Sequence, residues 1–196
     1  MPTLYQLKPR FQNLLRPLVA AFARAGITAN QVTLATCATS LALGAWLAIE
    51  HRGWILLPIF LFLRMALNAI DGMLATEFGQ KSKLGAILNE LTDVLSDAAL
   101  AFPIATLPGW NPLAVAAAIF FAALTEMAGL LGLAIGGPRR YDGPFGKSDR
   151  AFVLGFFGSW LALDWPVSES VRTAVPFLWI ALCCWTITQR VRRALG

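Results

Sequence analysis

Apolar and polar residues follow one another along this chain in long blocks. From residue 29 onward, six mostly apolar segments are separated by short stretches of glycine, proline or charged residues. A membrane-spanning helix needs about 20 mostly apolar residues, and most of these segments reach that length. We therefore expect six spans, the fifth with the shortest purely apolar part, near residues 29–49, 54–77, 83–107, 112–136, 148–164 and 171–190.

The N-terminal residues show a different pattern. Between residues 4 and 25, apolar side chains such as Leu4 and Leu7 recur every three or four positions, with basic residues such as Lys8 between them. This spacing is typical of an amphipathic helix that lies in the membrane interface. Pro9 and Pro17 are expected to break that helix, and Gly26 to end it.

These patterns predict an all-α integral membrane protein. We expect residues 1–27 to form the amphipathic juxtamembrane helix and residues 28–196 to form one domain of six transmembrane helices. The composition agrees, because 57% of the residues are hydrophobic and only 14% are charged. These values exclude a disordered chain and argue against a soluble enzyme, whose charged fraction is usually about 25%.

The basic residues predict how the chain is oriented. With six spans, all 16 Lys and Arg residues fall on one side except Arg52, Arg64 and Arg172. Basic residues gather on the cytoplasmic side of membrane proteins, so we expect both termini in the cytoplasm. The net charge of +5 then reflects topology and contact with anionic lipid, and no nucleic-acid partner is expected.

Polar residues occur inside two of the expected spans, where insertion into lipid is costly. On each span they repeat at helical spacing and share one face. The two faces carry Arg64, Asn68 and Asp71 in the second segment, and Asn89, Asp93 and Asp97 in the third.

Carboxylates and amides on two adjacent antiparallel helices would point towards each other near the cytoplasmic surface. A divalent cation would relieve the repulsion between the carboxylates, and oxygen ligands favour Mg²⁺ or Mn²⁺. Two other interpretations are hydrogen bonding between the helices and a transport pathway lined by the buried charges.

The spacing of these residues resembles the signature of the CDP-alcohol phosphotransferase family, D-x-x-D-G-x-x-A-R, eight residues, G-x-x-x-D-x-x-x-D. Every spacing matches, but two aspartates are replaced by asparagine and the arginine by threonine. This chain reads Asn68-x-x-Asp71-Gly72-x-x-Ala75-Thr76, eight residues, Gly85-x-x-x-Asn89-x-x-x-Asp93. The segment from Gly26 to Thr33 and the six spans also resemble the family.

The resemblance implies an enzyme that transfers a phosphatidyl group from CDP-diacylglycerol to a small polar alcohol and releases CMP. It implies a divalent metal, Mg²⁺ or Mn²⁺, held against the diphosphate by motif aspartates, and a last aspartate that acts as base. It also implies a homodimer in the membrane. An inner-membrane location in a bacterium, with the active site cytoplasmic, fits the charge distribution.

Carried over to this chain, the resemblance makes Asp93 the base. The expected metal ligands are Asp71, Asn68, Asn89, Asp93 and Asp97, with Glu90 as the other residue that could restore negative charge. The expected nucleotide-binding residues are Asp71, Gly72, Ala75, Thr76, Gly85 and Asn30.

The loop before the fifth segment is the second candidate binding region. Its lysine, serine and arginine follow a flexible glycine turn, which suits a phosphate group. The expected phosphate- or acceptor-binding residues are Lys147, Arg150, Ser148, Arg64 and Lys83. The basic pair Lys147 and Arg150 favours a phosphorylated acceptor, with glycerol 3-phosphate first, although the same pair could equally serve the donor or only set topology. Glu126, inside the fourth span, is expected to face the site or to pack between helices. The alternative function is a catalytically degenerate family member that binds a lipid or a partner protein.

Overall fold

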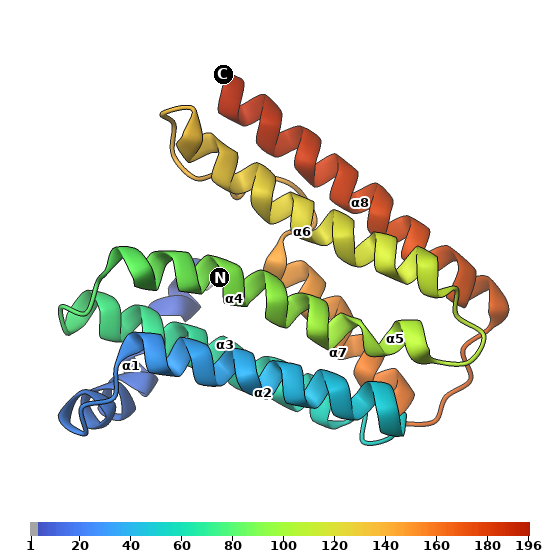
Figure 1. Cartoon of the computed structure of the whole chain (residues 1–196), viewed down its shortest axis with the longest axis horizontal. Coiled ribbons are helices and arrows are strands. Elements are labelled where there is room, and N and C mark those ends of the chain that lie inside the picture. Colours follow the sequence, from blue (N-terminus) through green and yellow to red (C-terminus); the bar gives the residue numbers. More distant parts are fainter. Residues whose placement is uncertain (1–3) are drawn as a thin grey trace. The chain divides into compact units, whose positions relative to one another are not determined.

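Every regular element in the computed structural model is a helix, as the sequence predicts, within the residues that the structure describes, 4–196 (Figure 1). Side chains are described from residue 9 onward, so the predictions on Leu4, Leu7 and Lys8 lie outside the described side chains. The helices are α1 (Leu4–Arg24), α2 (Ala29–Glu50), α3 (Leu56–Glu77), α4 (Lys83–Ala101), α5 (Pro103–Thr106), α6 (Pro112–Ala134), α7 (Lys147–Ala162) and α8 (Glu169–Leu195).

Each of the six predicted segments contains a long helix, and four of these helices are long and apolar enough to cross a membrane: α2, α3, α6 and α8. The third segment is not one helix, because Pro103 lacks the N–H that would continue α4 and instead begins the short α5. The fifth segment forms α7, which has only 16 residues. Six spans therefore remain a prediction, while four helices among the described residues have the length and composition of membrane spans.

The prediction that Pro9 and Pro17 break the first helix is wrong. α1 runs without interruption through both prolines. Each proline removes one hydrogen bond, but packing of the apolar face of α1 holds the helix together, since Val19 is fully buried against α2 and α3. Gly26 ends the helix as expected, with a φ of 74° and a bond from the next amide, Ile27, to the carbonyl of Phe22.

The chain forms two compact units, each described here by itself. The first unit contains the residues up to Ser40 and Phe60–Ser96, and the second contains Leu41–Ile59 and Asp97–Gly196. The core of the first unit joins α1, α2 and α3 through Val19, Ala29, Val32, Ile70, Met73 and Leu74.

The start of α2 in the first unit is fixed from two directions. The Thr28 hydroxyl accepts a bond from the amide of Gln31, and the Gln31 side chain accepts one from the amide of Thr28. The Gln80 side chain, in the loop before α4, accepts a bond of 2.7 Å from the amide of Ala29. This bond ties the loop before α4 to the first turn of α2.

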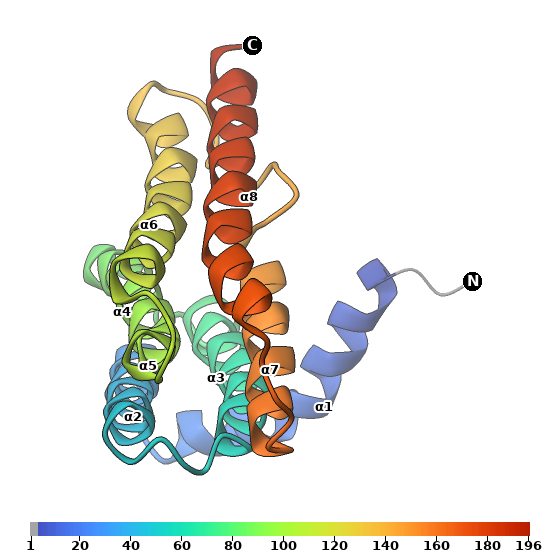
Figure 2. The same ribbon diagram turned by 90° about the vertical axis from the view of Figure 1, so that its right-hand side faces the viewer.

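In the second unit, α6 and α8 lie side by side, as both views show (Figures 1 and 2). The loop between α6 and α7 folds back on them, with the Arg140 amide bonded to the carbonyl of Gly129 over 3.0 Å. Glycine is required at residue 129, since a methyl group there would lie 2.6 Å from the carbonyl oxygen of Arg140. The loop also reaches α8, where the Thr186 hydroxyl accepts a bond from the amide of Phe145.

Candidate active site

Asp71 lies on α3 in the first unit, and its side chain contacts α2. Asp71 is only 6% exposed, and its Oδ2 accepts a hydrogen bond of 2.7 Å from the hydroxyl of Thr33 on α2. A buried carboxylate is costly unless it is paired or hydrogen-bonded, so this contact helps to hold Asp71 in place. The sequence singled out Asp71 but not its partner. The signal for Thr33 was present, because the hydroxyl residues Thr33, Thr36 and Ser40 recur on one buried face of α2.

Asp93 lies on α4 and contacts the polar face of α3. Its Oδ1 accepts a bond of 3.2 Å from the Asn68 amide and one of 3.3 Å from the Arg64 guanidinium. Arg64 is 3% exposed and also donates to the backbone carbonyl of Asp93. The two polar faces expected from the sequence therefore meet at Asp93.

The glycines of the signature lie in two different settings. Gly85 is close to α2, because a methyl group at this residue would lie 2.8 Å from Oδ1 of Asn30 and 3.0 Å from the hydroxyl of Ser82. A methyl group at Gly72 would meet no atom within 4 Å. On the same helix, the Thr76 hydroxyl donates back to the carbonyl of Gly72. Of the two glycines in the expected nucleotide site, only Gly72 has space around it for an added methyl group.

The other predicted residues of the first unit lie on its helices. Ala75 is half-buried against the core of the unit. Asn89 and Glu90 are half-buried on α4, and Lys83 is exposed at its first residue. Their expected roles stay predictions.

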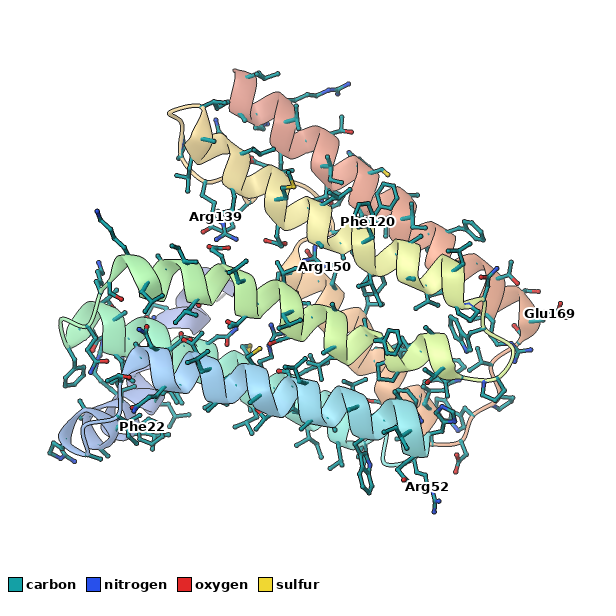
Figure 3. All side chains as sticks on the ribbon, viewed as in Figure 1. Phe22, Arg52, Phe120, Arg139, Arg150 and Glu169 are labelled. Carbon is teal, nitrogen blue, oxygen red and sulfur yellow. The ribbon has the colours of Figure 1, made fainter. Side chains whose placement is uncertain are left out.

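The second unit holds a separate charged cluster around Glu126 on α6. Oε1 of Glu126 lies 2.8 Å from Nη2 of Arg150 and 3.5 Å from Nη1 of Arg190, and its Oε2 lies 3.3 Å from Nη2 of Arg139. Arg139 and Arg150 lie along the same side of the α6 ribbon (Figure 3). Asp97 adds a second carboxylate to this cluster, with Oδ2 at 3.8 Å from Arg150.

The sequence predicts Arg150 as a phosphate-binding residue and does not predict its contact with Glu126, and it gives no role in this cluster to Arg190. Arg190 was interpreted only as one of the basic residues that set topology, yet it is 2% exposed. The signal was a buried face of α8 that carries Cys183, Thr186 and Arg190 at helical spacing. Lys147 is half-buried and Ser148 exposed in the first turn of α7.

The first unit contains the types of oxygen ligand that a hard divalent cation prefers. Asp71 and Asp93 offer carboxylates, and the amides of Asn68 and Asn89 offer neutral oxygens, which are the ligands that Mg²⁺ and Mn²⁺ accept. Within residues 4–196, no three His, Cys, Asp or Glu side chains gather as a metal site. A metal in the first unit would therefore rely on amide oxygens beside its two carboxylates.

The described residues form helices only, and several of these helices are long enough to span a membrane. Carboxylate and amide side chains contact one another on α3 and α4. These features define an integral membrane protein with a polar site among its helices. The chain belongs to the CDP-alcohol phosphatidyltransferase family, which residues 26–187 match. Enzymes of this family are metal-dependent transferases of phospholipid biosynthesis. The sequence-based assignment to the family is thereby confirmed.

Several known proteins resemble this chain. Inner membrane protein YnbA of Escherichia coli K12 is 46% identical over 197 residues, which cover 98% of this chain and 96% of that protein. Archaetidylinositol phosphate synthase of Pyrococcus horikoshii is 33% identical over 102 residues, about half of either chain (52% and 53%). The fold is similar to Mycobacterium tuberculosis phosphatidylinositol phosphate synthase, solved with manganese and citrate, with a TM-score of 0.76, 18% identity, and coverage of 92% of this chain and 88% of that one.

Proposed function

We propose that this protein transfers a phosphatidyl group from CDP-diacylglycerol to a small polar alcohol and releases CMP. The observation that carries the proposal is the contact of Asp93 on α4 with Asn68 and Arg64 on α3, next to Asp71 in the same signature. Membership of the family supports the reaction class. Glycerol 3-phosphate, the acceptor favoured by the sequence, remains one acceptor to be tested.

Asp93 is proposed as the base. The alcohol oxygen attacks the phosphorus that carries diacylglycerol, the bond to CMP breaks, and the alcohol proton passes to Asp93. Arg64 and Asn68 both donate to Oδ1 of Asp93, so they fix the direction of the carboxylate.

A divalent ion would be held in the first unit by Asp71 and Asp93, with amide oxygens from Asn68 and Asn89. When bound, it supplies positive charge to the diphosphate as CMP leaves. Thr33 keeps Asp71 oriented through its hydroxyl. Gly72 leaves space against α3 in which the nucleotide can approach the backbone, and Ala75, Thr76, Gly85 and Asn30 complete the proposed nucleotide site.

The test is release of CMP by the purified full chain. CDP-diacylglycerol in detergent micelles is mixed with Mg²⁺ or Mn²⁺ and with glycerol, glycerol 3-phosphate, inositol, inositol phosphate or serine. CMP release that needs both the metal and one alcohol is the expected result. Absence of CMP release with every alcohol and either metal would overturn the proposal.

A degenerate family member that binds lipid or a partner is the second candidate function. The specific observation in its favour is that Asn68 and Asn89 carry no charge where the family signature has aspartates. This candidate predicts binding of CDP-diacylglycerol without turnover. Binding of the lipid measured beside CMP release separates the two functions.

We also propose that both termini and the active site face the cytoplasm and that the protein forms a homodimer. The distribution of Lys and Arg supports the orientation. Reporter enzymes fused to the C-terminus, active only on one side of the membrane, test it. Mass measurement of the protein in micelles tests the dimer.

A further inference from the structure

Arg64 is a buried cation on the polar face of α3, in the first unit. It is 3% exposed, although it lies well inside a helix of membrane length. Its Nη2 donates to Oδ1 of Asp93 over 3.3 Å and to the backbone carbonyl of Asp93 over 3.1 Å. A charged residue inside a span is costly and is retained where it pairs with an opposite charge or serves a function. The opposite charge here belongs to the proposed base.

The bond to the backbone holds Arg64 at this place independently of the Asp93 side chain. The carbonyl belongs to α4 and stays where it is when the carboxylate turns towards a metal. The positive charge is permanent as well, because a guanidinium group is not deprotonated in proteins. Arg64 therefore remains beside Asp93 when a divalent ion binds, and its charge opposes every further cation there.

The charges of the two polar faces suit a single divalent ion. The family signature has four aspartates at these spacings, and this chain keeps two of them, Asp71 and Asp93. Four carboxylates carry the charge that two divalent ions balance, whereas two carboxylates beside Arg64 carry one net negative charge. If Glu90 on α4 is included, the net charge is matched by one divalent ion. A second ion would place excess positive charge beside a buried guanidinium, where like charges repel strongly.

We propose that Arg64 is a built-in cation that takes the place of a second divalent ion beside Asp93, so that each chain binds one Mg²⁺ or Mn²⁺. Arg64 is then a positioning residue, which acts through Asp93, and the proposal rests on the metal-dependent transfer proposed above. It differs from the sequence-based expectation that Arg64 binds a phosphate or the acceptor. A purely structural Arg64 would join α3 to α4 without affecting the number or the affinity of bound ions.

The first experiment counts the Mn²⁺ ions bound to the purified full chain in micelles, without any turnover. Equilibrium dialysis gives the number of ions and their Kd, and loss of the electron paramagnetic resonance signal of free Mn²⁺ gives both values independently. One ion per chain is the expected result. Two ions of similar Kd, or no bound Mn²⁺ at all, would overturn the proposal.

The second experiment removes the charge of Arg64. Arg64→Gln keeps an amide donor for Asp93 and loses the charge, so the affinity for Mn²⁺ should rise by about ten-fold or more. Arg64→Lys keeps the charge and should bind Mn²⁺ with the Kd of the unmodified protein. Arg24→Gln is the matched control, because it makes the same change at an exposed residue in the last turn of α1. Unchanged or weaker Mn²⁺ binding in Arg64→Gln, with the control unaffected, would assign Arg64 a structural role and refute the proposal.

Thermal unfolding measures the same relationship through stability. Arg64→Gln should lower the Tm in the absence of metal, because Asp93 loses its charged partner. Mn²⁺ should then raise the Tm of Arg64→Gln more than it raises that of the unmodified protein, since tighter binding stabilises more. An equal or smaller rise counts against the proposal. If Arg64→Gln does not fold, the number of ions on the unmodified protein still decides.

Failure of this proposal is distinguishable from failure of the proposed function. If no alcohol supports CMP release, the function fails, and the Mn²⁺ titration still decides the role of Arg64. If CMP is released and two ions bind to each chain, the function stands and the role of Arg64 is wrong. Where both are correct, CMP release should rise with the Mn²⁺ concentration with a Hill coefficient of about 1, as one site requires.

Discussion

Asn68 donates its side-chain amide to Oδ1 of Asp93 over 3.2 Å, at a position where the family signature has an aspartate. An aspartate at residue 68 would offer no donor, so two carboxylates would face each other in this place. They would repel each other without a cation between them. Asparagine therefore lets α3 and α4 meet at this point without depending on a metal for that contact.

Asn68→Asp should increase the dependence of the protein on divalent metal. The added carboxylate supplies a charged ligand, so the affinity for Mn²⁺ should rise by about ten-fold or more. Without metal, the new repulsion with Asp93 should lower the Tm. Thermal unfolding of the variant with and without Mn²⁺ measures both effects, and Asn13→Asp, on the exposed side of α1, is the matched control. Equal Mn²⁺ affinity in Asn68→Asp and the unmodified protein would show that residue 68 does not face the metal.

Asp93→Asn should remove activity and preserve the fold. An asparagine carbonyl still accepts from Arg64 and Asn68, but it does not take up the proton of the alcohol. CMP release should fall by about 10²-fold to 10⁴-fold, the usual contribution of a general base. The control Asp164→Asn makes the same chemical change at an exposed residue with a φ of 51°, which asparagine tolerates. Near-normal turnover in Asp93→Asn, with the control unaffected, would exclude Asp93 as the base.

The helices were predictable because apolar block length and helical spacing are local properties of the sequence. The exceptions have local causes too. Pro103 divides the third segment, whereas Pro9 and Pro17 lie in a helix whose packing against α2 and α3 compensates for the lost bonds. Whether a proline breaks a helix therefore depends on tertiary contacts, and the spacing of residues along the sequence does not reveal those contacts.

The candidate site was predictable where residues share a helix and less so where they come from different helices. The polar faces of α3 and α4 follow from spacing, and their meeting at Asp93 was expected. Thr33 and Arg190 were missed because their roles arise only when distant segments pack together. Arg150 was identified as a basic residue of interest, but its carboxylate partner Glu126 lies 24 residues away on another helix.

Gly72→Ala should separate nucleotide binding from stability. A methyl group at residue 72 meets no atom within 4 Å, and alanine favours a helix over glycine by about 0.5–1 kcal/mol, so the Tm should rise slightly. The same methyl group would occupy space proposed for the nucleotide, so binding of CDP-diacylglycerol should weaken. Gly85→Ala is the contrasting variant, because its methyl group would lie 2.8 Å from Asn30 and should lower stability as well. Unchanged lipid binding in Gly72→Ala would place the nucleotide elsewhere.

Gly44→Ala should destabilise the second unit. A methyl group at residue 44 would lie 2.2 Å from the backbone carbonyl oxygen of Ala99, a contact that no side-chain rotation relieves. Glycine is used at such close helix contacts in membrane proteins because it lets backbones approach each other. Overpacking of this kind costs about 1–3 kcal/mol, and a rigid backbone contact should lie at the upper end. Thermal unfolding in micelles measures the loss, with Ala45→Gly on the exposed side of the same turn as control, for which about 1 kcal/mol is expected. A Gly44→Ala variant as stable as the unmodified protein would mean that α2 and α4 do not approach each other at Ala99.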